Sequence, residues 1–143
     1  MNYLNCKSFA KINSCLHVIN KRTDGYHDIE SIFYSINFYD TLTFRKNNLK
    51  KICFDSNSND IDSKSNLVTK AFDIMYREYN DISGLDVFLD KVIPIGSGLG
   101  GGSSNAAATL IAINKIFNLN LSSNVLKNLA IQIGSDVPFF IDG

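Results

Sequence analysis

The sequence predicts an α+β fold in which helices pack on one face of a sheet. Two observations lead to this prediction. The first half is rich in β-branched and aromatic residues, which are typical of strands, and the second half alternates helical apolar spacing with short apolar runs. The chain has 143 residues, of which 45% are hydrophobic and 20% charged. This is the composition of one globular domain, and it excludes a disordered or collagen-like chain.

The first half is expected to consist of strands joined by turns. A strand over Ser8–Asn20 leads into a polar turn in which Gly25 supplies a positive φ. A second strand follows over Tyr26–Phe38. The runs Asp40–Lys46 and Lys50–Asp55 are expected to form a hairpin, and residues 56–65 form a polar loop.

The second half is expected to alternate between helix, strand and loop, without a linker that would divide it into domains. The elements are a helix over Asn66–Tyr79 with Ser65 as its N-cap, a strand over Leu85–Ile93, a glycine loop over Pro94–Gly102, helices over Ser103–Phe117 and Ser122–Ile133 with Gly134 ending the second, and a strand over Val137–Ile141.

Charge and hydropathy bear on the class of partner. Lys and Arg together number 14, as do Asp and Glu, and this balance argues against a nucleic-acid binder, which usually carries a basic excess. No apolar run reaches ~18 residues, so no membrane span is expected. The first seven residues lack the apolar core of a signal peptide, and the sequence predicts a cytoplasmic protein without a membrane partner.

The cysteines and histidines show no metal-ligand spacing. Cys6, Cys15 and Cys53 form no CxxC pair and are expected to be buried or half-buried free thiols of a reducing compartment. His17 and His27 are each more often structural when they stand alone. The sequence therefore predicts no metal site and no tightly bound cofactor.

The glycine loop is the strongest functional signal in the chain. Residues 94–104 hold five of the nine glycines, directly after an expected strand and before an expected helix. Glycines let backbone N–H groups approach an anion, and a helix N-terminus adds unpaired N–H groups and a positive dipole end. Ser103 and Ser104 add hydroxyls for a phosphate or for a metal held by it. The alternative is a flexible turn, and phosphate binding is the better interpretation.

The two best-known phosphate-loop patterns fit this loop poorly. A Walker loop ends in Gly-Lys-Ser or Gly-Lys-Thr, whereas Gly102 is followed by Ser103. The glycines at 96, 98 and 101 match the dinucleotide pattern, but no acid follows about 20 residues later to bind a ribose. The dinucleotide match is therefore weak.

Two charged residues are candidates for chemistry near this loop. No Asp or Glu occurs between Asp90 and Asp136, which favours a positive potential around an anion site. Asp136 is a candidate general base, with a structural cap or turn aspartate as the alternative. Lys11 lies within an apolar strand, where it either reaches solvent or meets a buried anion, and reaching solvent is the safer interpretation from the residues alone. The pair Tyr26 and His27 suits a flat heterocycle, although Tyr26 in the sheet core is an equal alternative.

Taken together, the motifs resemble those of the GHMP kinases. The run Pro-Ile-Gly-Ser-Gly-Leu-Gly-Gly-Gly-Ser-Ser at 94–104 is similar to the phosphate loop of that family. Ala-Lys-Ile-Asn at 10–13, Arg-x-Asp-Gly-Tyr-His at 22–27 and Gly-x-Asp-Val-Pro-Phe-Phe at 134–140 resemble the member that phosphorylates a cytidine diphosphate polyol in isoprenoid biosynthesis.

The resemblance implies a fold and a set of roles. The fold is the GHMP N-terminal domain, which is like domain 2 of ribosomal protein S5. Lys11 and Asp136 would form the catalytic pair, with Asp136 taking the proton of the substrate's 2-hydroxyl and Lys11 holding that carboxylate. ATP would bind with Mg²⁺ as co-substrate, and the substrate would be a small cytidine diphosphate polyol. The implied ATP-binding residues are Pro94, Ile95, Gly96, Ser97, Gly98, Leu99, Gly100, Gly101, Gly102, Ser103, Ser104, Asn66 and Lys91. The implied substrate-binding residues are Asn13, Tyr26, His27 and Phe33.

Departures from the family pattern leave alternatives open. Phe9 stands where a proline usually precedes Ala-Lys, and Ser97 replaces a loop glycine. The resemblance implies that residues 1–143 are an N-terminal ATP-binding domain without the C-terminal domain that closes over substrate, so this piece alone is expected to be inactive. Another GHMP kinase and a non-catalytic binding module of the same fold, including an RNA-binding one, are the alternatives. The sequence does not indicate an oligomeric state.

Overall fold

The computed structural model describes residues 3–21 and 27–142. Four strands form one mixed sheet in the order β1-β2-β4-β3. Strand β1 (Leu4–Lys21) pairs antiparallel with β2 (His27–Lys46), which pairs antiparallel with β4 (Leu85–Asp90). Strand β3 (Ile52–Ser56) lies at the other edge, parallel to β4.

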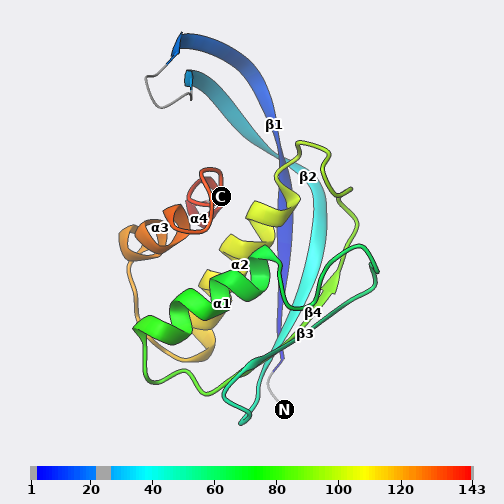
Figure 1. Cartoon of the computed structure of the whole chain (residues 1–143), viewed down its shortest axis with the longest axis vertical. Coiled ribbons are helices and arrows are strands. Elements are labelled where there is room, and N and C mark those ends of the chain that lie inside the picture. The colour runs from blue at the N-terminus through cyan, green and yellow to red at the C-terminus, as the bar shows by residue number, and fades with distance from the viewer. Residues whose placement is uncertain (1–2, 22–26, 143) are drawn as a thin grey trace.

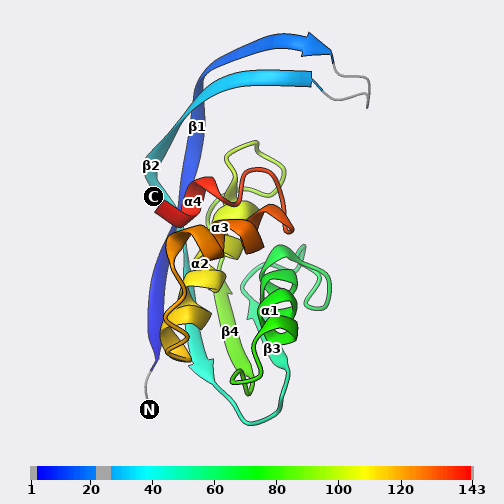
Figure 2. The same cartoon turned by 90° about the vertical axis from the view of Figure 1, so that its left-hand side faces the viewer.

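The helices cover one face of this sheet, which confirms the predicted fold class. Helix α2 (Gly101–Ile116) packs on β1 and β2, and α1 (Leu67–Glu78) lies beside it. The shorter α3 (Ser123–Ile131) and α4 (Phe139–Asp142) pack against α2. Beyond the helices the paired strands β1 and β2 continue as a two-stranded arm, which projects at the top of Figures 1 and 2.

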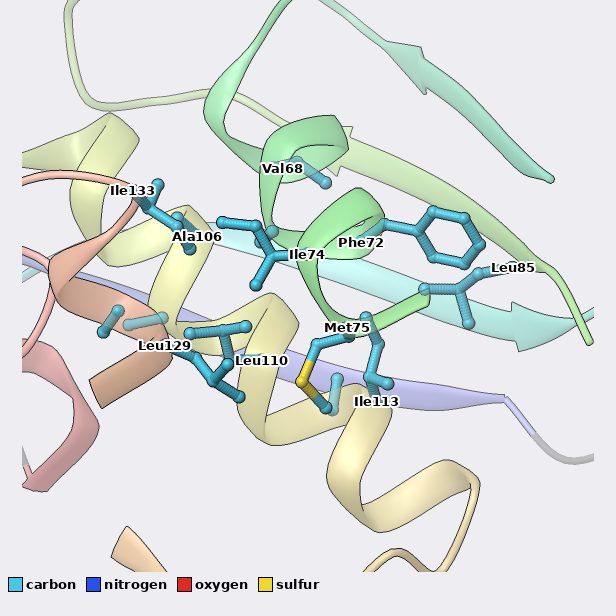
Figure 3. Packing of buried hydrophobic residues seen from close by; sticks show 14 of the residues in the cluster. Val68, Phe72, Ile74, Met75, Leu85, Ala106, Leu110, Ile113, Leu129 and Ile133 are labelled. Carbon is cyan, nitrogen blue, oxygen red and sulfur yellow. The ribbon is translucent and has the colours of Figure 1, made fainter. Parts of the chain in front are cut away.

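The core lies between the sheet and the two longer helices (Figure 3). One face of the sheet contributes apolar side chains in strict alternation along β2 and β4, all at most 3% exposed: Leu42, Phe44, Leu85, Val87 and Leu89. Helix α1 contributes Phe72 and Met75, and α2 contributes Leu110 and Ile113. Because this core lies against α2, it holds the N-terminus of that helix, and the loop before it, in a fixed place on the sheet.

The predicted hairpin between residues 40–46 and 50–55 is wrong. Strand β3 pairs with β4, and β4 lies between β2 and β3. Strand β4 is thus central in the sheet, and its apolar row, Leu85, Val87 and Leu89, is buried beneath the helices. The expected strands over 26–38 and 40–46 are one strand, β2, whose pairing with β1 shifts register between Phe9 and Ala10.

The predicted strand over 137–141 is also wrong. These residues follow turn hydrogen bonds in which Val137 N–H donates to the Gly134 carbonyl and Phe140 N–H donates to the Val137 carbonyl, and they end in the short helix α4. Their apolar side chains are buried against α2 rather than in a sheet, and a short apolar run does not distinguish these environments.

The remaining expectations from composition have clear outcomes. Cys6 and Cys53 are half-buried free thiols as expected, whereas Cys15 is exposed. None of the helices in residues 3–21 and 27–142 combines the length and apolar character needed to cross a bilayer.

Candidate active site

A cleft of about 440 Å³ opens between the glycine loop, the start of α2 and the start of α1. The loop wall contains most of the predicted ATP-binding residues: Pro94, Ile95, Gly96, Ser97, Gly98, Gly100, Gly101, Gly102 and Ser103. Asn66 and Lys91 lie in the other walls. Leu99 and Ser104 do not line the cleft. The structure therefore brings together eleven of the thirteen residues at one concave surface, and nucleotide binding by them remains a prediction.

The loop takes its shape from three glycines in the left-handed region. Gly96, Gly98 and Gly100 have φ values of 72°, 76° and 72°. A residue with a β-carbon is strained there, so alternate glycines allow the backbone to reverse repeatedly within a few residues. Ser97 lies between two of them, and its hydroxyl donates to the Pro94 carbonyl oxygen at 2.8 Å, which closes the first turn of the loop. The Ser97 departure is thus accommodated without a positive φ at that residue.

The N-terminus of α2 faces this cleft. The first hydrogen bond of the helix runs from Ser104 N–H to the Gly100 carbonyl at 2.9 Å, so the N–H groups of Gly101, Gly102 and Ser103 precede the helical ladder. The first turn has no acidic residue. Unpaired N–H groups and a positive dipole end make such a terminus an anion site.

The two serines of the loop have different surroundings. Ser103 lines the cleft. Ser104 is 4% exposed and its hydroxyl lies 2.8 Å from the hydroxyl of Ser8, which also lies 2.7 Å from Asn105 Oδ1. This buried network ties β1 to the first turn of α2. Ser103 is therefore the hydroxyl available to a ligand.

Lys11 is buried and meets an anion, so the interpretation that it reaches solvent is wrong. It is 6% exposed, and its Nζ lies 3.5 Å from Asp136 Oδ2 and donates to Asn13 Oδ1 at 2.7 Å. The Phe33 ring lies beneath the ammonium, 4.6 Å from it. Asp136 comes from the turn before α4 and keeps 36% of its side chain exposed. The pair thus has one buried cation and one carboxylate that is partly open to solvent.

The main chain of Lys11 connects this pair to the loop. Lys11 N–H donates to the Leu99 carbonyl at 2.9 Å, and a β-carbon on Gly100 would lie 3.0 Å from Lys11 Cγ. Leu99 thus serves the site through its backbone. The carboxylate and the glycine loop are held next to each other by a single residue of β1.

The predicted substrate-binding residues that the structure describes, Asn13, His27 and Phe33, belong to the base of the arm or to the arm itself. Asn13 and Phe33 are cross-strand partners beside Lys11, and the Phe33 ring packs edge-on against Phe139 at 5.2 Å. His27 begins β2, where its backbone pairs with Lys21. Tyr26 lies outside the described residues. The structure therefore brings Asn13 and Phe33 to the Lys11–Asp136 pair, and their binding role remains a prediction.

Several residues at the site were missed by sequence reasoning. Asp60 and Asp62, from the polar loop before α1, line the same cleft as the glycines. The cleft therefore contains carboxylates, although the sequence between Asp90 and Asp136 has none. Nothing in the sequence around Asp60 and Asp62 indicated this position. Asp40 is fully buried and binds the segment that leads into the glycine loop. The sequence signal that could have identified Asp40 is an acidic residue within the apolar run that forms β2.

Asn66 has a structural role that the sequence had assigned to Ser65. Its Oδ1 accepts from Val68 N–H and Thr69 N–H at 2.9 and 3.0 Å, and Thr69 Oγ1 accepts from Asn66 N–H at 3.1 Å. This is a reciprocal capping arrangement at the N-terminus of α1. Asn66 therefore lines the cleft as part of a rigid helix start.

This geometry gives a prediction for the capping role of Asn66. Asn66→Ala should lower the free energy of unfolding by about 0.5–2 kcal/mol, because two N–H groups lose their acceptor. Asn66→Asp should retain most of the stability, since Asp is an equally good N-cap. Urea unfolding of both variants measures this difference. Equal stability of Asn66→Ala and the wild type would contradict the capping role.

Three comparisons with known proteins agree on the family. The GHMP kinases N terminal domain matches residues 66–143. A 4-diphosphocytidyl-2-C-methyl-D-erythritol kinase of Prochlorococcus marinus is 48% identical over 141 residues, which is 98% of this chain and 45% of the relative. The enzyme of the same name from Burkholderia cenocepacia is 40% identical over 139 residues, covering 97% of this chain and 47% of the relative.

Solved structures extend the likeness to the fold. A crystal structure of 4-(cytidine 5'-diphospho)-2C-methyl-D-erythritol kinase matches with a TM-score of 0.83 and 31% identity, over 98% of this chain and 49% of that one. Homoserine kinase from Cytophaga hutchinsonii matches with a TM-score of 0.72 at 19% identity, over 93% of this chain and 41% of that one, and shares the fold. The chain spans about half the length of the relatives that it matches. With the family domain matched over more than half of its residues, the chain belongs to the GHMP kinase family.

Proposed function

We propose that this chain is the nucleotide-binding half of an ATP-dependent kinase that phosphorylates the 2-hydroxyl of 4-diphosphocytidyl-2-C-methyl-D-erythritol, in the non-mevalonate isoprenoid pathway. The observation that carries the proposal is the direct link between the glycine loop and a carboxylate–lysine pair, made by Lys11. The relatives of this name, about twice as long, support the choice of substrate. The activity is accordingly proposed for a protein of their length.

ATP is proposed to bind in the cleft with its phosphates toward the N-terminus of α2. The N–H groups of residues 101–103 and the helix dipole stabilise negative charge there without a cation in direct contact. Phosphoryl transfer depends mainly on positioning and on electrostatic stabilisation of the equatorial oxygens, and both are properties of such a loop. The base would lie deeper in the cleft, between Asn66 and Lys91.

Mg²⁺ is proposed to enter with ATP rather than to occupy a site of its own. Hard oxygen ligands suit Mg²⁺, which is usually held by one or two protein groups together with substrate phosphates. The Ser103 hydroxyl is the oxygen of the loop wall that fits this role. When bound, the ion would neutralise charge that develops on the phosphates.

Asp136 and Lys11 are proposed to act on the acceptor alcohol. Asp136 removes the proton of the 2-hydroxyl while the oxygen of that hydroxyl attacks the γ-phosphorus of ATP. The bond between the γ-phosphorus and the bridging oxygen of the β-phosphate breaks, and ADP leaves. Lys11 orients the carboxylate at 3.5 Å and adds positive charge beside the transferred group. Asn13 and Phe33 hold Lys11 from its other sides. With Tyr26 and His27 they are proposed to form the cytidyl side of the substrate site.

The experiment that tests the function is a phosphorylation assay with a panel of alcohols. ATP, Mg²⁺ and a protein of the relatives' full length carrying these 143 residues are combined separately with 4-diphosphocytidyl-2-C-methyl-D-erythritol, homoserine, mevalonate and galactose. We expect phosphate transfer to the cytidyl substrate alone. Preference for another alcohol would assign a different GHMP kinase. No transfer, with tight and steeply salt-dependent RNA binding, would instead assign a binding module.

A loop substitution tests whether the glycines hold the nucleotide. Gly98 has a positive φ and open space around it, so Gly98→Asp and Gly98→Asn share nearly the same strain and shape and differ in one negative charge. We expect Gly98→Asp to weaken ATP binding at least tenfold more than Gly98→Asn does, because the charge lies beside the phosphates. Calorimetric titration of the two folded variants measures the ratio. Equal affinities would mean that the loop is a turn without a phosphate.

A further inference from the structure

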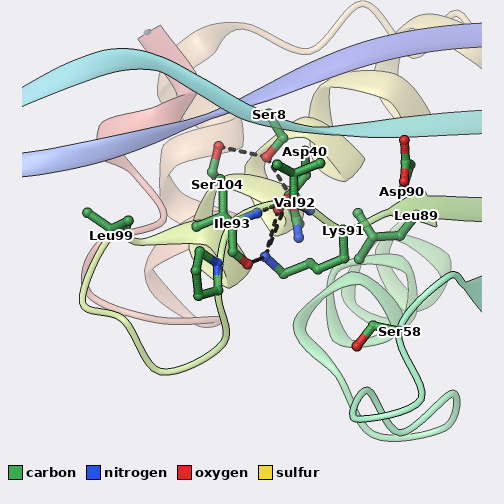
Figure 4. A network of polar contacts seen from close by, with 12 residues as sticks. Ser8, Asp40, Ser58, Leu89, Asp90, Lys91, Val92, Ile93, Leu99 and Ser104 are labelled. Carbon is green, nitrogen blue, oxygen red and sulfur yellow. Dashed lines mark hydrogen bonds and ion pairs between the residues drawn. The ribbon is translucent and has the colours of Figure 1, made fainter.

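The segment that leads into the glycine loop is anchored by one buried carboxylate (Figure 4). Asp40 lies in β2, next to the last residue that pairs with β4, and is fully buried. Its Oδ1 accepts from Val92 N–H at 2.7 Å and from Ile93 N–H at 2.8 Å. These two residues connect the end of β4 to Pro94, where the loop begins. Charge-assisted bonds to two consecutive N–H groups fix the direction in which the chain leaves the sheet.

Lys91 completes this anchor by forming an ion pair with Asp40. Its Nζ lies 3.0 Å from Asp40 Oδ2 and also donates to the Ile93 carbonyl. The lysine side chain is 8% exposed and the aspartate side chain is not exposed at all. A buried carboxylate is costly without a partner cation, and the same holds for the ammonium. The ammonium is therefore neutralised by Asp40, although Lys91 lines the cleft.

The anchor also reaches the far end of the loop. A β-carbon on Gly101 would lie 2.9 Å from Ile93 Cγ2 and 3.1 Å from Lys91 Nζ, so the first residue of α2 packs directly on the anchored segment. Ile93 itself is fully buried. The two ends of the loop over residues 94–100 thus lie next to each other, and the position of both ends depends on the Asp40–Lys91 pair.

We propose that Asp40 and Lys91 are positioning residues for nucleotide binding: the pair fixes both ends of the glycine loop, and Lys91 does not act as a cation on the nucleotide. This inference rests on the proposed function in that ATP is the ligand. It differs from a direct contact in a measurable way. If the lysine charge serves only to neutralise Asp40, then removing both charges together preserves the site, whereas removing either one damages it.

A double-mutant cycle tests this inference. Asp40→Asn retains an acceptor for the two N–H groups and leaves the buried ammonium without its partner, and Lys91→Met leaves the buried carboxylate without its partner. We expect each single variant to weaken ATP binding about tenfold or more in calorimetry. The double variant should return to within about threefold of the wild type, since an amide and a thioether fill the same space without charge. Lys51→Met, at an exposed lysine away from the cleft, controls for the change in net charge.

The outcomes of the cycle are distinct. A double variant that binds ATP about tenfold or more weakly than the wild type would overturn the inference and make Lys91 a direct contact. Should a single variant fail to fold, the comparison of the double variant with the wild type still decides between these results.

Amide hydrogen exchange of Val92 and Ile93 tests the anchor without nucleotide. We expect Asp40→Ala to speed their exchange at least tenfold, and the neutral double variant to keep most of the protection. Unchanged exchange in Asp40→Ala would contradict the anchor. A wild-type chain that does not bind ATP would contradict the proposed function, whereas the exchange rates would still decide whether the anchor exists.

Discussion

Replacement of Asp136 by Asn is expected to lower kcat by at least ~10²-fold, with ATP binding nearly unchanged. The amide keeps the size of the side chain and removes its capacity to take a proton, and loss of a general base usually has an effect of this size. Asp136 lies outside the glycine loop and does not line the cleft, so nucleotide affinity should be preserved. Steady-state kinetics in a protein of the relatives' length, together with calorimetric titration of ATP, measures both quantities.

The same experiment with Lys11 tests whether the two residues act as a unit. Lys11→Ala should lower kcat to a similar extent, and the double variant should be little worse than either single one, because the second change removes a partner that no longer functions. Asp142→Asn is the matched control, since it removes a carboxylate from α4 that pairs with Lys127. Near-normal turnover of Asp136→Asn, or additive losses in the double variant, would contradict the assignment.

A second large effect is expected at Gly100, where a single methyl group would disturb both parts of the site. A β-carbon there would lie 2.9 Å from Phe140 Cζ and 3.0 Å from Lys11 Cγ, at a φ of 72°. Gly100→Ala should therefore destabilise the fold through backbone strain of about 1–2 kcal/mol. Overpacking should add about 1–3 kcal/mol, and kcat should fall as Lys11 moves.

Gly98→Ala separates these two contributions. Gly98 has nearly the same φ, 76°, and nothing lies within 4 Å of its β-carbon position. It should show the strain without the overpacking, so the difference in free energy of unfolding between the two variants measures the contact with Lys11 and Phe140. Urea unfolding gives both values. Equal destabilisation by the two substitutions would mean that the loop relaxes away from β1 at no cost.

Local signals in the sequence predicted the parts of the site that depend on local chemistry. Alternating glycines before an alanine-rich helix favour a loop whose glycines have positive φ, followed by a helix N-terminus. Both features follow from backbone geometry within a few residues. The three longer helices, α1, α2 and α3, were located to within two residues at most of their ends, since apolar spacing and caps are also local.

The features that depend on long-range packing were the ones that sequence reasoning missed. The order β1-β2-β4-β3 depends on which apolar rows share a core, and adjacent strands in sequence suggested a hairpin instead. From the residues alone Lys11 is expected to reach solvent, because its ion-pair partner Asp136 comes from the far end of the chain. The burial of Asp40 is likewise explained by the Lys91 ammonium that lies against it. No local pattern encodes these pairings. The resemblance to a family identified Lys11 and Asp136 as a pair but carried no information on Asp40.

The contacts of strand β1 restrict where residues can be inserted into or deleted from this chain. Between Ser8 and Lys11 it contacts in turn the first turn of α2 through the Ser8 hydroxyl, the Leu99 carbonyl through the Lys11 N–H, and Asp136 through the Lys11 ammonium. A register shift between Phe9 and Ala10 interrupts the alternation of the strand, so that Ser8 and Lys11, three residues apart, are both buried. One residue inserted between them would move Lys11 away from the Leu99 carbonyl and from Asp136. Homologous chains can therefore exchange side chains in this segment but not change its length, whereas the exposed turn at 48–50 is free to lengthen or shorten.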